Sequence, residues 1–81
     1  MKITVKMFAS FREYTGMPQS VVEVAPGTTI RQLWEMLVRQ HPRLVPLSKS
    51  AGFALNGLYT RSDDALAEGD VVAFLPPVSG G

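Results

Sequence analysis

The stretch Val71-Val72-Ala73-Phe74-Leu75 decides the fold of this chain. It is a continuous apolar run of strand length without polar alternation, a pattern typical of a strand that is buried on both faces. If Val72 and Phe74 face a covering helix, alternation turns the other three residues to the opposite face of the sheet. We therefore expect a second apolar face beside the point where this strand ends.

Six residues follow the apolar run, with the sequence Pro76-Pro77-Val78-Ser79-Gly80-Gly81. Each proline fixes φ and lacks an N–H group, so the pair projects the chain outward and prevents it from extending a sheet. The two glycines leave the terminal carboxylate sterically open, which makes it a candidate reactive group. We therefore predict a folded domain over residues 1–75 and a flexible C-terminal tail over residues 76–81. The competing interpretation is a frayed chain end without a role.

The segment from Lys2 to Phe8 alternates strictly and predicts a half-buried strand whose apolar face carries Ile3, Val5 and Met7. Phe8 falls by parity on the polar face. Its ring there either begins a bend into the core or contacts a partner, and the sequence leaves both possibilities open. A second alternating run, from Ser20 to Val24, predicts a strand antiparallel to the first.

The clearest helix begins at Thr29, a good N-cap with Gln32 three residues later, and ends before Pro42. Five apolar residues at helical spacing form one stripe that would cover a sheet: Ile30, Leu33, Trp34, Leu37 and Val38. A single tryptophan within such a stripe indicates core packing and not a ligand-stacking site. His41 has no cysteine or carboxylate at ligand spacing, so we expect a solvated residue of the last helical turn and not a metal ligand or general base.

Shorter elements are predicted in the second half of the chain. Arg43 to Gly52 is expected to be a loop. Residues 53–55 and 58–60 flank Asn56-Gly57, a dipeptide that favours a type I′ hairpin turn. Asp63-Asp64 is interpreted as part of a polar loop, because adjacent side chains point apart and sit in water, unlike a catalytic pair of carboxylates.

The order of these elements is strand, strand, helix and then two or more short strands. This order suggests an α+β protein of the β-grasp, or ubiquitin-like, class. In that fold a mixed sheet has one main helix packed across it, and the first and last strands run parallel at its centre. Another small α+β sheet would show the same periodicity and stays open at this point.

Composition excludes several classes of function. The chain has 81 residues, 46% hydrophobic and 19% charged, with a formal net charge of +1, which predicts one small domain. The basic residues form no run that would suggest nucleic-acid binding. No segment approaches the roughly 20 apolar residues of a membrane span, and no signal peptide is evident, so a cytoplasmic protein is expected. The absence of cysteine excludes disulfides, thiolate nucleophiles and zinc–cysteine sites.

Four sequence features together resemble one known family. They are Phe8-Ala9-Ser10-Phe11-Arg12-Glu13, the Asn56 hairpin, the Glu68-Gly69-Asp70 turn and the Pro-Pro-x-x-Gly-Gly ending. The chain resembles, over essentially its whole length, the small subunits of molybdopterin synthase, which are ubiquitin-like sulfur carriers. The resemblance implies a β-grasp fold and sulfur carried as a C-terminal thiocarboxylate in molybdenum cofactor biosynthesis.

The resemblance also assigns roles to individual residues. Gly81 would carry the acyl-adenylate and then the thiocarboxylate, and Gly80 would let the tail thread a narrow channel. The preceding tail residues, Pro76, Pro77, Val78 and Ser79, would hold it extended. Three residues match the apolar docking surface of the family: Phe8, Tyr59 and Leu75. Tyr59 stands where relatives can have an aliphatic residue, and Arg12 and Glu13 match family positions without an assigned role.

The partners implied by the resemblance supply the chemistry. An E1-like adenylating enzyme would consume ATP, a sulfurtransferase would donate sulfur, and the large synthase subunit would accept the tail, with a heterotetramer as the resting assembly. The carrier itself would bind no cofactor and no metal. Its apolar surface makes a homodimer of the isolated chain plausible.

Three alternatives remain open from the sequence. The chain could carry sulfur for another pathway, such as thiamine thiazole synthesis. It could be a ubiquitin-like modifier that forms isopeptide bonds through Gly81. It could also be a non-covalent β-grasp interaction module that uses an apolar patch around Phe8 and Leu75, with no role for the tail.

Overall fold

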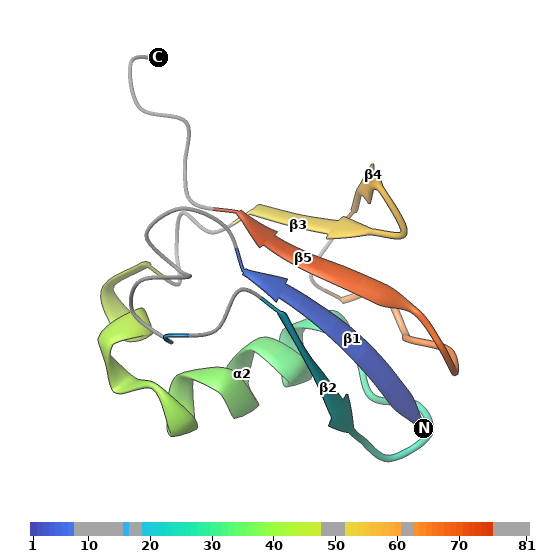
Figure 1. Ribbon diagram of the computed structural model, residues 1–81, viewed down its shortest axis with the longest axis horizontal. Coiled ribbons are helices and arrows are strands. Elements are labelled where there is room, and N and C mark those ends of the chain that lie inside the picture. The colour runs from blue at the N-terminus through green and yellow to red at the C-terminus, as the bar shows by residue number, and fades with distance from the viewer. Residues whose placement is uncertain (8–15, 17–18, 48–51, 61–62, 76–81) are drawn as a thin grey trace.

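A mixed sheet covered on one face by a helix forms the framework of the protein (Figure 1). The computed structural model describes residues 1–7, 16, 19–47, 52–60 and 63–75. The elements are β1 (Lys2–Met7), β2 (Gln19–Glu23), α2 (Ile30–Gln40), the 3₁₀-helix η1 (Pro42–Leu47), β3 (Gly52–Leu55), β4 (Leu58–Tyr59) and β5 (Val71–Leu75). Phe8, Arg12, Glu13 and the tail from Pro76 to Gly81 lie outside the described residues, and the predicted division at residue 75 stays a prediction.

The five strands lie in the order β2-β1-β5-β3-β4. β1 pairs antiparallel with β2 and parallel with β5, and β5 pairs antiparallel with β3. The first and last strands are therefore parallel neighbours, which confirms the predicted β-grasp arrangement. Met7 lies opposite Phe74, so β1 and β5 end at the same end of the sheet.

The helix α2 starts where the sequence predicted. The Gln32 N–H donates to the Thr29 hydroxyl at 3.2 Å, and the Thr29 N–H donates to the Gln32 side-chain oxygen at 3.0 Å, which completes a capping box. At the other end, the His41 N–H donates to the Leu37 carbonyl at 2.8 Å and Pro42 follows. His41 is the C-cap residue and is half-buried.

The core lies between α2 and the covered face of the sheet. Ile3, Val5, Val72 and Phe74 are fully buried on the sheet side, and Ile30, Leu33, Trp34 and Leu37 are buried on the helix side. The rings of Trp34 and Phe74 lie 5.1 Å apart between centroids, and the Phe53 ring packs edge-on against Phe74 at 5.3 Å. Trp34 is only 5% exposed, which confirms the core interpretation. Val38, the last residue of the predicted stripe, is half-buried.

The segment after α2 differs from the prediction. Residues 43–52 were expected to form a loop, but Pro42–Leu47 is a 3₁₀-helix and Gly52 already belongs to β3. Leu44 is fully buried in this turn, and its N–H donates to the His41 carbonyl at 2.9 Å. Pro42 favours the turn because proline fits the first position of a helix, where its missing N–H has no partner to lose.

The Asn56-Gly57 turn is confirmed. Both residues have positive φ, 51° for Asn56 and 89° for Gly57, as a type I′ turn requires. The turn joins β3 to β4, with Leu55 opposite Leu58 and Ala54 opposite Tyr59. Thr60, predicted as the last residue of the second strand, follows β4, and its N–H donates to the Phe53 carbonyl at 3.1 Å.

Candidate functional site

The sheet face turned away from α2, called here the open face, is the first candidate for a functional surface. The strand registers place these described residues on it: Lys2, Thr4, Lys6, Gln19, Val21, Glu23, Gly52, Ala54, Tyr59, Val71, Ala73 and Leu75. On β5, Val72 and Phe74 are fully buried, whereas Val71, Ala73 and Leu75 are only half-buried. The prediction that β5 is buried on both faces is therefore wrong. The helix α2 covers only the face that carries Val72 and Phe74 (Figure 1).

Apolar side chains gather on the β5-β3-β4 part of the open face. Ala73 lies opposite Ala54, and Ala54 lies opposite Tyr59, which is 80% exposed. Leu75 lies in the next row, opposite Gly52. The structure thus places two of the three predicted docking residues, Tyr59 and Leu75, on one face; Phe8 lies outside the described residues. An exposed apolar surface of this kind is a candidate contact site for another protein.

The open face also lies next to the start of the tail. β5 ends at Leu75, and the next residue in the chain is Pro76. β1 ends beside it, because Met7 pairs with Phe74, and the next residue there is Phe8. The tail and the segment that begins with Phe8 therefore both start at the same end of the sheet, where β1 and β5 end. This end lies next to the apolar part of the open face.

A cluster of hydrogen bonds ties the β3-β4 hairpin to the start of β5. The Val71 N–H donates to the Asn56 side-chain oxygen at 2.9 Å, and the Asn56 N–H donates to the Val71 carbonyl at 2.8 Å. The Asn56 amide nitrogen donates to Asp70 at 3.1 Å, and the second Asp70 oxygen accepts from the Ala67 N–H at 2.7 Å. This Asn56–Asp70 cluster holds the hairpin that carries Tyr59 against the strand that carries Leu75.

Sequence reasoning missed the Asn56–Asp70 cluster. Both residues were identified only as parts of separate turns, which are 14 residues apart in the chain. Their side chains meet because β3 and β5 are paired, a long-range contact that turn chemistry does not reveal. The one available signal was that both turns carry the family resemblance.

We expect Asn56→Ala to lower the free energy of unfolding by about 3–4 kcal/mol. The change removes side-chain hydrogen bonds worth about 1 kcal/mol each and places alanine in a left-handed conformation that costs about 1–2 kcal/mol. Asn56→Gly is the matched control, because it loses the same hydrogen bonds without the backbone strain. Urea unfolding should rank the proteins wild type, Asn56→Gly, Asn56→Ala. An alanine variant as stable as wild type would contradict a holding role for the cluster.

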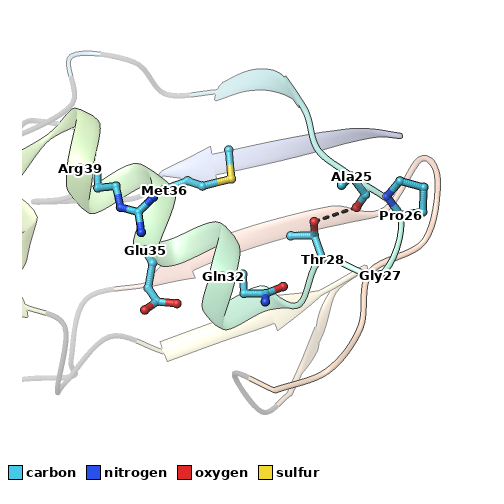
Figure 2. A pocket seen from close by; sticks show the side chains of 8 residues that line it. All are labelled: Ala25, Pro26, Gly27, Thr28, Gln32, Glu35, Met36 and Arg39. Atoms are coloured by element: carbon cyan, nitrogen blue, oxygen red, sulfur yellow. Dashed lines mark hydrogen bonds between the residues drawn. The ribbon is translucent and has the colours of Figure 1, made fainter.

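A hollow lies on the helix side of the molecule. It is lined by the loop from Ala25 to Thr28 and by the α2 residues Gln32, Glu35, Met36 and Arg39 (Figure 2). The Thr28 hydroxyl donates to the Ala25 carbonyl at 2.7 Å and fixes the loop. Neither Tyr59 nor Leu75, the two predicted site residues that the structure describes, lines this hollow.

The remaining candidates from the sequence lie apart from the open face. Asp63 is exposed and Asp64 half-buried in a loop, as predicted, and the Asp64 carbonyl accepts from the Ile30 N–H at 2.9 Å. Within the described ranges, no three His, Asp or Glu side chains come together as metal ligands would. No described helix combines the length and the apolar character needed to cross a membrane.

Comparison with known proteins places the chain in a family. The model of the ThiS family matches residues 5–81. The molybdopterin synthase sulfur carrier subunit of Chlamydomonas reinhardtii is 40% identical over 83 aligned positions, covering all of both chains. The subunit of the same name from Mycobacterium tuberculosis is 34% identical and covers 100% of this chain and 99% of its own. SAMP1, the small archaeal modifier protein 1 of Haloferax volcanii, superposes with a TM-score of 0.83 at 30% identity over the full length of both chains. The chain belongs to the ThiS family.

Proposed function

We propose that this chain is the sulfur carrier subunit of a molybdopterin synthase. In this proposal a thiocarboxylate on Gly81 donates sulfur to cyclic pyranopterin monophosphate, which forms the dithiolene of molybdopterin. The observation that carries the proposal is the full-length similarity, at 40% identity, to a relative with that name. The family match also extends through residue 81, so it includes the Gly80-Gly81 pair.

The chemistry needs only the terminal carboxylate of the carrier. A terminal carboxylate has a pKa of about 3.5, so at neutral pH it is an anion that resists nucleophilic attack. An E1-like enzyme would join it to AMP from ATP and release pyrophosphate. Sulfur from a sulfurtransferase, reduced by a thiol to the sulfide level, would then attack the acyl carbon and displace AMP, which leaves the thiocarboxylate, an anionic sulfur nucleophile. Each dithiolene has two sulfurs and would consume two charged carriers.

The folded part of the chain would supply docking. The apolar part of the open face, with Tyr59 and Leu75, offers a surface for the large synthase subunit next to the start of the tail. The partner's active site would hold the precursor, and the tail would deliver the sulfur to it. This division of labour is consistent with the absence of cysteine from the chain, because the transferred sulfur would be held on the main-chain carboxyl group.

A mass measurement tests the proposal directly. The chain should be recovered under denaturing conditions from its own cells, and the intact mass and the C-terminal peptide should be measured. We expect a fraction of molecules in which one oxygen of the Gly81 carboxylate is replaced by sulfur. Recovery of the unmodified carboxylate alone, also from cells in which molybdenum cofactor synthesis is induced, would contradict a sulfur carrier.

A second candidate function is protein modification. It is favoured by the similarity to SAMP1 of Haloferax volcanii, which is named a modifier protein and shares 30% identity over the full length of both chains. In this case the activated Gly81 carboxyl would be transferred to lysine amines of other proteins. Lysines that carry the C-terminal peptide of this chain, found in the same mass spectra, would identify a modifier.

Deleting Gly80-Gly81 separates both covalent functions from a non-covalent interaction module. A carrier or a modifier should lose all activity, because the activated carboxyl is displaced from its position. A module that acts only through the apolar part of the open face should keep its function. The readouts are restored molybdopterin synthesis in cells that lack the chain for a carrier, lysine-linked conjugates for a modifier and retained binding to a partner protein for a module, each with the full-length chain as control.

A further inference from the structure

We propose that Lys6 is a charged docking residue, and that the large synthase subunit places an aspartate or glutamate carboxylate against its ammonium group. The inference rests on the proposed function, in which the open face is the surface that meets this subunit. It adds the chemistry of the partner surface, which would be an apolar area bordered by a carboxylate.

The charges on the open face are unevenly balanced. Its described residues include three charged side chains, Lys2, Lys6 and Glu23. Lys2 lies directly opposite Glu23, and its backbone N–H also donates to the Glu68 carboxylate at 3.2 Å. The positive charge of Lys2 therefore has negative charge close by within the protein.

Lys6 has no such neighbour on the sheet. It lies opposite Gln19 on one side and Ala73 on the other, and neither side chain is charged. Within the part of the chain that the structure describes, Lys6 makes no ion pair. It is half-buried, and a lysine in such a place commonly covers its aliphatic stem and keeps its ammonium in water.

The position of Lys6 adjoins the proposed contact area. Ala73, its neighbour on β5, begins the row that continues through Ala54 to Tyr59. Leu75 is the next residue of β5 on the same face. A partner that covers Tyr59 and Leu75 while it receives the tail would therefore remove water from the Lys6 ammonium.

Removing water from a charged group without giving it a partner is unfavourable. A partner that binds the open face must therefore offer an acceptor to Lys6, and an ionised carboxylate makes a stronger hydrogen bond than a neutral acceptor. Opposite charges would also speed association and disfavour partners that present a cation or a bare apolar group at this point.

The test compares charge changes of equal size at two positions. Lys6→Glu reverses the charge on the open face, and Arg31→Glu does so on the exposed surface of α2. Lys6→Met removes the charge and keeps the stem. Association with the purified large subunit should be measured over a range of salt concentrations, and urea unfolding should show that all variants fold like wild type.

We expect Lys6→Glu to weaken binding at least tenfold, mainly by slower association, and its difference in affinity from wild type should shrink as salt is added. The affinity of Lys6→Met should lie between those of Lys6→Glu and wild type. The affinity of Arg31→Glu should be within about twofold of wild type. If Lys6→Glu and Lys6→Met bind as tightly as Arg31→Glu, the inference about Lys6 is overturned while the proposed function stands. If the wild-type chain does not bind the large subunit, the proposed function fails and the inference with it.

Discussion

Phe74→Ala is expected to remove about 3–5 kcal/mol from the free energy of unfolding, the usual cost of deleting a fully buried phenylalanine ring. Phe74 is completely buried on β5 and contacts the rings of both Trp34 and Phe53. A domain of 81 residues has a total stability of roughly 4–12 kcal/mol, at about 0.05–0.15 kcal/mol per residue. The variant should therefore lose a large share of its stability at room temperature.

Urea unfolding measured by far-UV circular dichroism and by the fluorescence of Trp34, the single tryptophan, would test this. Phe74→Leu should cost less, because it keeps most of the buried volume. Val45→Ala is a control for shortening an apolar side chain at a surface site, since Val45 is 54% exposed, and it should change stability by at most about 0.5 kcal/mol. A loss below about 1 kcal/mol for Phe74→Ala would show that this ring does not join helix to sheet.

Local patterns in the sequence were sufficient to predict most of the sheet and the helix. The alternation in β1 directly gave its buried residues, since side chains in a strand point to opposite faces in turn. Thr29 and Gln32 marked the start of α2 because both partners of a capping box lie within one helical turn. Asn56-Gly57 was recognisable because few other dipeptides accept positive φ at both positions.

Features that depend on distant parts of the chain were not predictable in this way. Leu44 sits in a short turn without periodicity, so only the packing of η1 against the core reveals that it is buried. The partial exposure of Val71, Ala73 and Leu75 depends on what covers the sheet, which the residues of β5 alone do not encode. The apolar run was correctly assigned to a central strand, but only one of its two faces is buried in the core.

The predicted docking residues also combine a local signal with a long-range one. The resemblance supplied Tyr59 and Leu75 as separate positions, and the strand registers bring them to one face. Alternation in the sequence puts Lys6 on the polar side of an amphipathic strand, where a lysine needs no explanation. Its significance follows only from the neighbours that the sheet gives it, Gln19 and Ala73, and from the apolar row that begins beside it.

The largest effect on activity is expected from Gly81→Ala. A methyl group on the last residue would crowd the adenylate and the channel that receives the tail, and misplacing a reacting group by about 1 Å can cost roughly 100-fold in rate. We therefore expect formation of the thiocarboxylate, followed by intact mass with the activating enzyme, ATP and the sulfur donor, to slow by roughly that factor or more. Urea unfolding should be unchanged, because Gly81 lies six residues beyond the end of β5 at Leu75.

Ser79→Ala is the matched control for this change, because it also places alanine in the tail but leaves both glycines at the terminus. It should be converted to the thiocarboxylate at close to the wild-type rate, since the reacting carboxyl keeps its unbranched neighbour. If both variants reacted slowly, the activating enzyme would recognise the side chains of the whole tail. The steric freedom at residue 81 would then not by itself determine the rate. A methyl group next to the reacting carboxyl should slow its activation. If Gly81→Ala reacted as fast as wild type, Gly81 would therefore not be the site of activation.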